Sequence, residues 1–382
     1  MGPLSGVRVL EFQGIGPGPF CAMMLADMGA DVLVIHRLES ADLGLDIERR
    51  FRVVSRGRRS VLLDLKTAAG KEAGLLLAAK ADVLIEGLRP GVMERLGIGP
   101  VPCLERNSRL VYGRMTGWGQ EGPLKHAAGH DINYIAVTGA LHAIGRNGSK
   151  PTPPLNLLGD FGGGGMFLAF GVACALLEAR VSGKGQVVDA AMVDGAALLS
   201  AAYYGMVQAG SWRLDRGANP LDSGAPWYDT YETLDGKYVS IGPIERRFYD
   251  EMLRRLGIAD ENLPEPRDRG GWSELRERFA VVFKSRSRED WCTVFLGSDA
   301  CFAPVLDFDE ATTHPASIAR NAFVEVEGVR QPAPAPRYSR TPASVQRRVP
   351  EKGEGGGEAL VDWGFSPGEI EDLRALGVGW CA

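Results

Sequence analysis

Short apolar runs alternate with helix-like segments through the first third of the chain, and this alternation restricts the fold more than any other feature. Helices are expected at 20–28 and 68–80, and the runs expected as strands are 7–12, 31–35, 60–64, 82–86 and 110–113. Repeated strand–helix units of this length are typical of a parallel sheet with helices on both faces. The sequence therefore predicts an α/β fold with a large, Rossmann-like, doubly wound domain.

The pattern changes near residue 160 and predicts a second, smaller domain. Long apolar helices are expected at 166–180 and 190–208, followed by a polar stretch rich in Gly and Pro at 215–226. Leu234-Asp235-Gly236-Lys237 then gives a hairpin signal. We expect a large domain over 1–195 completed by 330–382, a linker at 196–225, a small α+β domain at 226–310 and a return linker at 311–329.

Composition excludes several classes of protein. The net charge of −5 gives no electrostatic case for nucleic-acid binding. The six cysteines form no C-x-x-C pair and the five histidines form no ligand cluster, so neither a disulfide framework nor a metal site is expected. The chain start lacks a signal-peptide profile, no run of about 20 apolar residues is found, and the end lacks Ser-Lys-Leu. We expect a soluble intracellular protein, cytoplasmic or in the peroxisomal lumen, that binds neither nucleic acid nor membrane.

A glycine-rich turn after the first strand raises the question of a dinucleotide site. The pattern G-x-G-x-x-G would need a glycine at position 19, where the chain has Pro19. The second strand ends in His36 and Arg37 rather than in an acidic residue for a ribose hydroxyl. The sequence therefore disfavours an NAD site, and the glycines are interpreted as permitting a tight turn.

Basic residues follow successive predicted strands. They are Arg37, Lys66 and Arg89, with Arg95 on the next helix. Ligands of open α/β sheets gather at the carboxyl ends of the strands. Coenzyme A, an adenosine ligand with an extra 3′-phosphate, could bind to such a set of cations. The alternative is that the four side chains are solvated surface charges. The sequence alone leaves both interpretations open.

Two short stretches carry candidate catalytic side chains. His130-Asp131-Ile132-Asn133-Tyr134 follows a glycine and opens an apolar run, so it is expected at a helix amino terminus capped by Asp131 or a neighbour. Asp160 precedes four glycines and a helix, a turn expected to present N–H groups to a developing oxyanion. A capping Asp and a core His are commoner than a catalytic pair, so spacing alone decides nothing.

Several motifs resemble the α-methylacyl-CoA racemase branch of the family III CoA-transferases (CaiB/BaiF-like). The His-Asp-Ile-Asn-Tyr box at 130–134 is specific to racemase-like members of that family. The segments that carry the resemblance, which spans nearly the whole chain, are 17–23, 89–97, 129–134, 154–161, 183–190 and 242–249.

The resemblance implies an isomerase that inverts the α-carbon of acyl-CoA thioesters by 1,1-proton transfer. His130 and Asp160 would be the two acid/base groups, and Glu245 would orient the histidine from the partner subunit of an interlocked homodimer. The positions implied for coenzyme A contacts are Arg37, Leu63, Lys66, Gly87, Arg89, Arg95, Gly129, Asp131 and Tyr134. No separate cofactor is implied, because coenzyme A is part of the substrate, and an acyl-CoA ligase is an expected upstream partner.

The acyl group has more than one interpretation. A 2-methylacyl chain is the default for this family. Arg246 and Arg247 stand where known racemases have Pro and Gln. They could pair with a polar acyl chain, as in isopenicillinyl-CoA epimerisation during cephalosporin formation. The alternative is that both arginines are surface charges. Two rivals remain: a CoA-transferase with Asp160 as nucleophile, which the presence of His130 disfavours, and a non-catalytic acyl-CoA binder.

Overall fold

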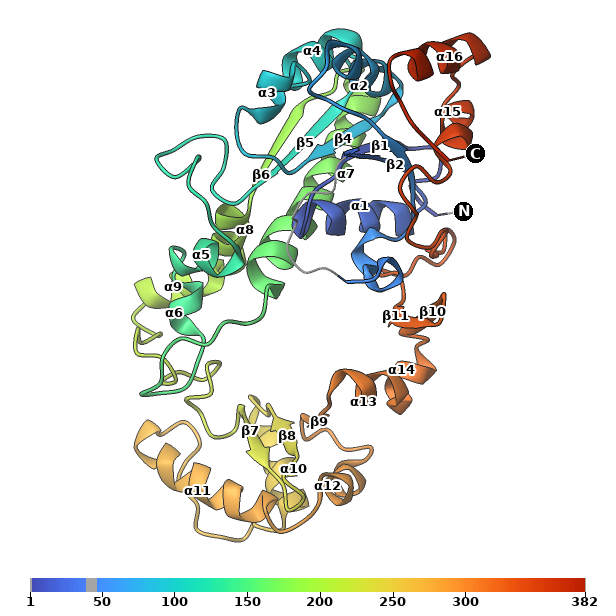
Figure 1. Ribbon diagram of the computed structural model, residues 1–382. Helices are drawn as coiled ribbons and strands as arrows, with labels where there is room; N and C mark the ends of the chain where they lie inside the picture. Colours follow the sequence, from blue (N-terminus) through green and yellow to red (C-terminus); the bar gives the residue numbers. More distant parts are fainter. Residues whose placement is uncertain (1, 39–46, 382) are drawn as a thin grey trace. The chain divides into compact units, whose positions relative to one another are not determined.

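The computed structural model describes residues 2–38 and 47–381 (Figure 1). The chain forms two compact units. The first comprises Met1–Thr138, Leu155–Leu199 and Asn321–Ala382, and the second comprises Gly139–Pro154 and Ser200–Arg320.

The first unit is built on a six-stranded parallel sheet in the order β3-β2-β1-β4-β5-β6. Its strands are β1 (Arg8–Phe12), β2 (Asp31–His36), β3 (Arg58–Leu62), β4 (Val83–Glu86), β5 (Val111–Thr116) and β6 (Val187–Ala191). The first five coincide with predicted strands within a few residues. The predicted mixed α/β fold with a large parallel sheet is therefore confirmed.

Two hydrophobic clusters cover the opposite faces of this sheet. Alternate residues of a strand point to opposite faces. Leu10 of β1 lies in the cluster that includes α2 and α15, whereas Val9 lies in the cluster that includes α1 and α7. The helices of this unit are α1 (Pro17–Asp27), α2 (Ala68–Lys80), α3 (Val92–Leu96), α4 (Pro100–Arg106), α5 (Asp131–Ala136), α7 (Phe167–Ser182), α8 (Met192–Leu199), α15 (Gly356–Asp362) and α16 (Pro367–Ala375).

Local sequence fixes several of these helix ends. Thr67 caps α2 by accepting the N–H of Gly70 at 2.9 Å. Ser366 and Glu369 form the predicted capping box of α16, with Pro367 at the first helical position. The remaining elements in the described part of the unit are the 3₁₀ turns η1 (Arg49–Phe51) and η2 (Val53–Ser55), the π-helical segment η3 (Leu157–Met166) and the hairpin of β10 (Phe323–Val326) and β11 (Val329–Pro332).

The helix predicted over 190–208 is wrong. Residues Val187–Ala191 form strand β6 beside β5, and two helices follow, α8 and α9 (Ala201–Gln208). Apolar spacing fits a short strand and a buried helix equally well, and the free edge of β5 decides in favour of the strand.

The open glycine turn predicted at 162–165 is also wrong. These residues lie inside a π-helical segment, Leu157–Met166, that runs directly into α7. A Cβ at Gly163 would lie 2.6 Å from the backbone nitrogen of Ala196, and one at Gly165 would lie 2.7 Å from the ring of Phe20. The glycines therefore allow close packing against α8 and α1 and do not form an open N–H cradle.

The helical run Leu157–Ser182 has 26 residues and is apolar enough to cross a membrane by length and composition. The expectation that no such run exists is thereby corrected, because the π-helical segment extends α7. Leu168, Val172 and Leu176 of α7 lie in a core cluster with strand residues of the sheet. Core packing accounts for these residues, whereas Phe170, Leu177 and Val181 on the same helix are exposed.

The second unit contains the antiparallel sheet β7-β8-β9, formed by Asp229–Glu232, Tyr238–Ile241 and Phe302–Val305. The predicted hairpin at 234–237 joins β7 to β8. Its helices are α6 (Ala140–Ala143), α9, α10 (Arg246–Leu256), the 3₁₀ turn η4 (Arg269–Gly271), α11 (Trp272–Phe283), α12 (Arg288–Phe295), α13 (Phe308–Thr313) and α14 (Pro315–Ala319).

The unit boundaries differ from the expected domains in three places, one of them the expected linker at 196–225, which is divided between Leu199 and Ser200. Residues 139–154, expected in the large domain, belong to the second unit. Arg146 pairs there with the buried Asp229, and Arg216 donates to the His142 carbonyl at 2.7 Å. The expected return linker is divided, since α13 and α14 belong to the second unit and β10 and β11 to the first.

Candidate active site

The candidate site lies where β1 and β4 are neighbours in the parallel sheet. The chain leaves these strands in opposite directions along the sheet, and at such a point ligands of open α/β sheets gather at the carboxyl ends of the strands. Gly16, in the loop after β1, has a φ of 64° and so favours glycine. A Cβ at Gly16 would lie 3.2 Å from Asp160 Oδ2. The carboxylate of Asp160 therefore lies against the loop that follows β1.

Asp160 is half-buried among polar neighbours. Asn156, one helical turn earlier, donates its amide to Asp160 Oδ2 at 3.0 Å. Burial raises the pKa of the Asp160 carboxyl and the nearby charge of Asp131 raises it further, while the Asn156 hydrogen bond and the nearby His130 lower it, with a net rise. Asp160 can consequently hold a proton at a higher pH than an ordinary aspartate. Asn156 is not among the predicted site residues. The one sequence signal for its contact with Asp160 is the spacing of four residues between the two.

His130 occupies the cap position of α5, as the sequence suggested for Asp131 or a neighbour. Its backbone N–H donates to Asn133 Oδ1 at 3.0 Å, which fixes the start of the helix. The side chain of His130 is exposed. The next residue, Asp131, accepts the backbone N–H of Asp160 at 2.7 Å, so the two predicted acid/base residues lie on segments that are hydrogen-bonded to each other.

Asp131 and Tyr134 are buried and make contacts within the site. Asp131 Oδ1 accepts the backbone N–H groups of Gly159 and Asp160 at 2.6 and 2.7 Å. The Tyr134 hydroxyl donates to the Gly129 carbonyl, and its ring meets Trp118 edge-on at 4.8 Å. Side chains held in this way support the site, so any contact they make with a ligand would come chiefly from their backbone.

The predicted coenzyme A positions fall at the same edge of the sheet. Arg37 follows β2, Lys66 follows β3, Gly87 and Arg89 follow β4, and Arg95 lies on α3. All four cations are exposed, and among the described residues their side chains make no ion pair or hydrogen bond. Leu63 is only 1% exposed and belongs to the core, so its side chain is not available to a ligand.

Glu245 belongs to the second unit, where it caps α10. The predicted approach of Glu245 to His130 of a partner subunit stays a prediction. Arg246 pairs with Asp250 at 2.8 Å and with Glu265 at 3.2 Å, and Arg247 lies over the Phe248 ring at 4.3 Å. These contacts favour the surface-charge interpretation of the two arginines.

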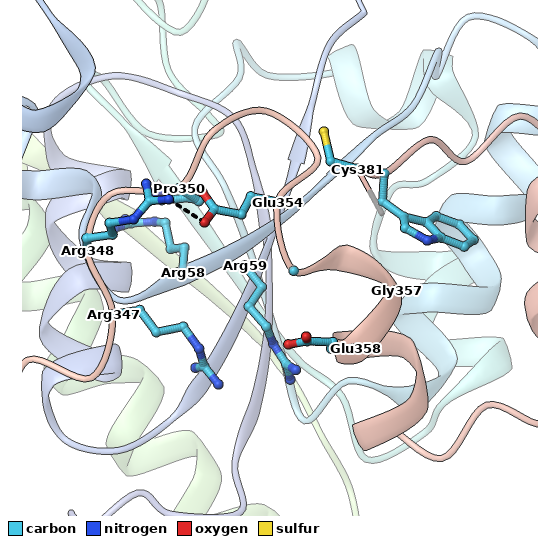
Figure 2. Close-up of a pocket in the computed structure, with 11 residues that line it drawn as sticks. Arg58, Arg59, Arg347, Arg348, Pro350, Glu354, Gly357, Glu358 and Cys381 are labelled. Carbon is cyan, nitrogen blue, oxygen red and sulfur yellow. Dashed lines mark hydrogen bonds and ion pairs between the residues drawn. The ribbon is translucent and has the colours of Figure 1, made fainter.

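A cavity of about 520 Å³ lies elsewhere, beside the outer strand β3 (Figure 2). Four arginines line it, and most of them form ion pairs with neighbouring carboxylates. Arg58 pairs with Glu11 at 2.5 Å, Arg59 with Asp362 at 2.5 Å, and Arg348 with Glu354 at 2.6 Å. This cavity is therefore not a candidate anion site.

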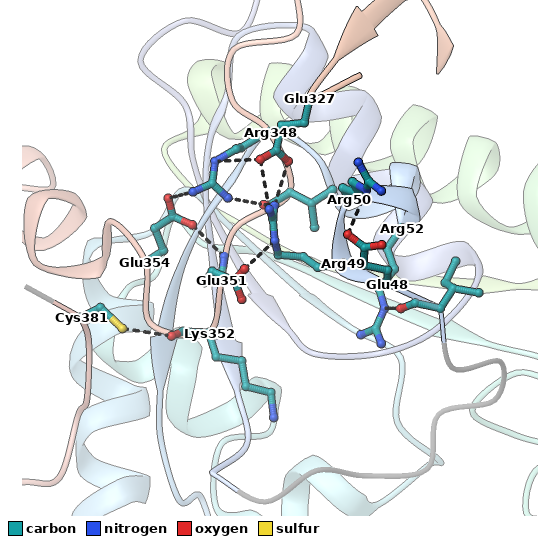
Figure 3. A network of polar contacts seen from close by, with 12 residues as sticks. Glu48, Arg49, Arg50, Arg52, Glu327, Arg348, Glu351, Lys352, Glu354 and Cys381 are labelled. Atoms are coloured by element: carbon teal, nitrogen blue, oxygen red, sulfur yellow. Dashed lines mark hydrogen bonds and ion pairs between the residues drawn. The ribbon is translucent and has the colours of Figure 1, made fainter. Parts of the chain in front are cut away.

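A polar network next to this cavity joins the carboxyl-terminal segment of the first unit to the 3₁₀ turn η1 (Figure 3). Arg49 pairs with Glu327 at 2.9 Å and with Glu351 at 2.7 Å. Arg348 approaches the same Glu327 at 3.5 Å. Residues distant in sequence are thus joined by shared carboxylates.

No group of three or more His, Cys, Asp or Glu side chains in the described part of the chain could hold a metal ion.

The fold is that of an open α/β protein, and its candidate site holds Asp160 against the loop that follows β1 and His130 at the start of α5. The chain belongs to CoA-transferase family III, whose profile matches residues 4–355. It is 45% identical over 374 residues to the α-methylacyl-CoA racemase of Mus musculus, covering 97% of this chain and 96% of that protein. The racemase of Homo sapiens is 43% identical with the same coverage.

A solved structure supports the same assignment. A CaiB/BaiF family protein from Brucella suis superposes with a TM-score of 0.82 at 25% identity, covering 95% of this chain and 99% of that one. The family resemblance inferred from the sequence motifs is therefore confirmed.

Proposed function

We propose that this chain is an acyl-CoA racemase that inverts the α-carbon of a coenzyme A thioester by proton removal on one face and proton return on the other. The observation that carries the proposal is the hydrogen bond, 2.7 Å long, from the backbone N–H of Asp160 to Asp131, the residue next to His130, together with the raised pKa of the Asp160 carboxyl. The high identity to two named racemases supports the same activity.

The mechanism needs one proton shared by the pair. The α-proton of a thioester is weakly acidic because the resulting carbanion delocalises onto the carbonyl oxygen. His130 would remove it from one enantiomer while protonated Asp160 donates on the other face, and the roles reverse for the opposite enantiomer. The first N–H groups of a helix lack intrahelical acceptors, so those of α5, next to His130, would bind the enolate oxygen. Both directions start from the singly protonated pair, and they therefore share one pH profile.

Coenzyme A would lie along the edge formed by the four unpaired cations. Arg89→Ala is expected to raise KM for an acyl-CoA about tenfold with kcat within about twofold, because a remote phosphate contact contributes to binding equally in ground and transition states. Steady-state kinetics measure this. Arg109→Ala, an exposed arginine before the amino end of β5, is the matched control and should leave KM unchanged. An equal effect of both substitutions would contradict the placement.

The partner and cofactor predictions extend this proposal. Phe170, Cys174, Leu177 and Val181 form an exposed stripe on α7 at helical spacing, which supports a homodimer. Glu245 of the partner subunit would then orient His130, and sedimentation of the purified chain tests the dimer. We propose that no further cofactor takes part, and that an acyl-CoA ligase supplies the thioester.

Deuterium washout tests the activity directly and identifies the acyl group. In heavy water, the wild-type protein should exchange the α-proton of 2-methylacyl-CoAs and interconvert their enantiomers. A panel that includes a thioester with a polar, carboxylate-bearing acyl chain compares the two substrate classes. If no α-exchange occurs and hydroxylamine traps an acyl group on Asp160, the CoA-transferase alternative replaces the racemase.

A further inference from the structure

We infer that the Asp131 carboxylate is a positioning group that fixes the separation between His130 and Asp160. This inference rests on the proposed function, because it concerns the same two residues. It assigns Asp131 a task distinct from the coenzyme A contact expected from the sequence.

The geometry places Asp131 between the two acid/base residues. Its main chain is bonded directly to His130, and its Oδ1 accepts the N–H groups of Gly159 and Asp160 at 2.6 and 2.7 Å. One side chain therefore joins the start of α5 to the first turn of the 157–166 segment. Two hydrogen bonds to one oxygen leave little freedom for the backbone of Asp160 to move relative to that of His130.

Gly159 makes this close approach possible. A Cβ at position 159 would lie 2.5 Å from Asp131 Oδ1 and 2.9 Å from its Cγ. Any other residue would push the Asp131 carboxylate away from the segment that it holds. The glycine at 159 and the aspartate at 131 thus depend on each other.

The second oxygen of this carboxylate shows that stability alone does not explain it. Asp131 is 5% exposed, and its Oδ2 is buried with no hydrogen-bond partner among residues 2–38 and 47–381. A buried carboxylate oxygen without a donor is unfavourable, and such groups concentrate at functional sites. The two hydrogen bonds use only Oδ1, so the buried and unpartnered Oδ2 points to a use for the charge beyond them.

That use is electrostatic. The groups that face Asp160 are Asn156 on its own segment and His130 and Asp131 at the start of α5, and Tyr134 on α5 also interacts with its charge. Arg89 after β4 interacts with Tyr134 in turn. Among these, Asp131 is the charge that opposes ionisation of Asp160. Asp131 therefore both positions Asp160 and helps it to retain its proton.

Two substitutions separate the positional role from the electrostatic one. Asp131→Asn keeps an oxygen that can accept both N–H groups but removes the charge, whereas Asp131→Ala removes both. Asp131→Asn should retain kcat within about tenfold, and Asp131→Ala should lower it about 100-fold in both directions, as expected for a small displacement of reacting groups. Asp82→Asn is the control, because Asp82 is another carboxylate that accepts a backbone N–H. It should leave kcat unchanged in both directions.

The pH profile gives a readout that a merely structural residue would not move. Removal of the Asp131 charge makes Asp160 lose its proton at lower pH, so the singly protonated pair persists to lower pH. The acidic limb of kcat/KM should therefore move to lower pH in Asp131→Asn, equally for both enantiomers. A profile that superimposes on the wild type, or an Asp131→Ala variant with wild-type kcat, would overturn the inference.

A spectroscopic measurement keeps this inference separate from the proposed function. The infrared band of the protonated Asp160 carboxyl, identified by its absence in Asp160→Asn, should disappear at lower pH in Asp131→Asn than in the wild type. If the wild type exchanges no α-protons but this shift occurs, the racemase proposal fails and the role of Asp131 stands. If the band titrates identically in both proteins, the role of Asp131 fails whatever the activity.

Discussion

Asp160→Asn and His130→Gln are each expected to abolish racemisation while sparing α-proton exchange from opposite enantiomers. Loss of one acid/base group should lower the rate of inversion about 10³-fold, within the range for general acid–base catalysis. With Asp160 neutralised, His130 can still remove and return the proton on its own face, so exchange with retention survives for one enantiomer. With His130 replaced, exchange should survive only for the other.

The measurement follows deuterium incorporation and chirality for each pure enantiomer in heavy water. KM should remain within about threefold of the wild type in both variants, because neither side chain lies among the four cations proposed to bind coenzyme A. Retained inversion in either variant, or loss of exchange from the same enantiomer in both, would contradict the assignment of opposite faces.

The pH dependence follows from the raised pKa of the Asp160 carboxyl. In the wild type, protonation of both groups stops catalysis at low pH and deprotonation of both stops it at high pH, which gives a bell-shaped profile. The raised pKa places the acidic limb above the range of an ordinary aspartate. Asp160→Asn should remove this limb from the surviving exchange reaction, leaving a single rise with pH.

The central strands could be predicted from the sequence because they are buried on both faces. Such strands read as continuous apolar runs between turn signals, as Asp31–His36 and Val83–Glu86 do. Strand β6 has exposed positions, including Val187, and its apolar residues merge with those of the next helix. Only the neighbouring edge of β5 distinguishes it, and that edge is a tertiary feature.

The candidate site was predictable in its residue types but not in its internal contacts. His130 and Asp160 stand out through their motifs. The tether from Asp131 to Gly159 is a contact between distant segments, and no local pattern indicates it. Leu63 fails as a side-chain contact for a related reason: its place in the core depends on how helices pack on the sheet. The glycines at 162–165 likewise owe their role to the neighbouring helices.

The largest expected effect on stability comes from Glu11 on the central strand β1, which pairs with Arg58 on the outer strand β3. Their side chains are 3% and 2% exposed. Arg58 donates to Glu11, to the carbonyls of Val54 and Arg56 at 2.9 Å, and to the carbonyl of Pro19 at 2.5 Å. Glu11→Ala leaves the guanidinium charge buried without a counterion, and should lower the free energy of unfolding by about 3–5 kcal/mol.

Urea unfolding of a double-mutant cycle measures this effect. Arg58→Met combined with Glu11→Leu should recover most of the loss, because a buried ion pair can be replaced by apolar side chains of similar volume at little cost. Glu72→Ala is the control in the same unit, since its pair with Arg106 at 3.0 Å is exposed and should contribute below about 1 kcal/mol. A cost for Glu11→Ala no larger than that control would show that Arg58 is not desolvated.

The same pair connects stability to the site. Arg58 holds the Pro19 carbonyl in the first turn of α1, and α1 begins directly after Gly16, the residue that lies against Asp160. Loosening this turn should displace the loop that lies against Asp160. Glu11→Ala is therefore expected to lower kcat as well, even at temperatures where the variant remains folded. The apolar double variant lacks the contact with the Pro19 carbonyl, so it should recover stability more completely than activity.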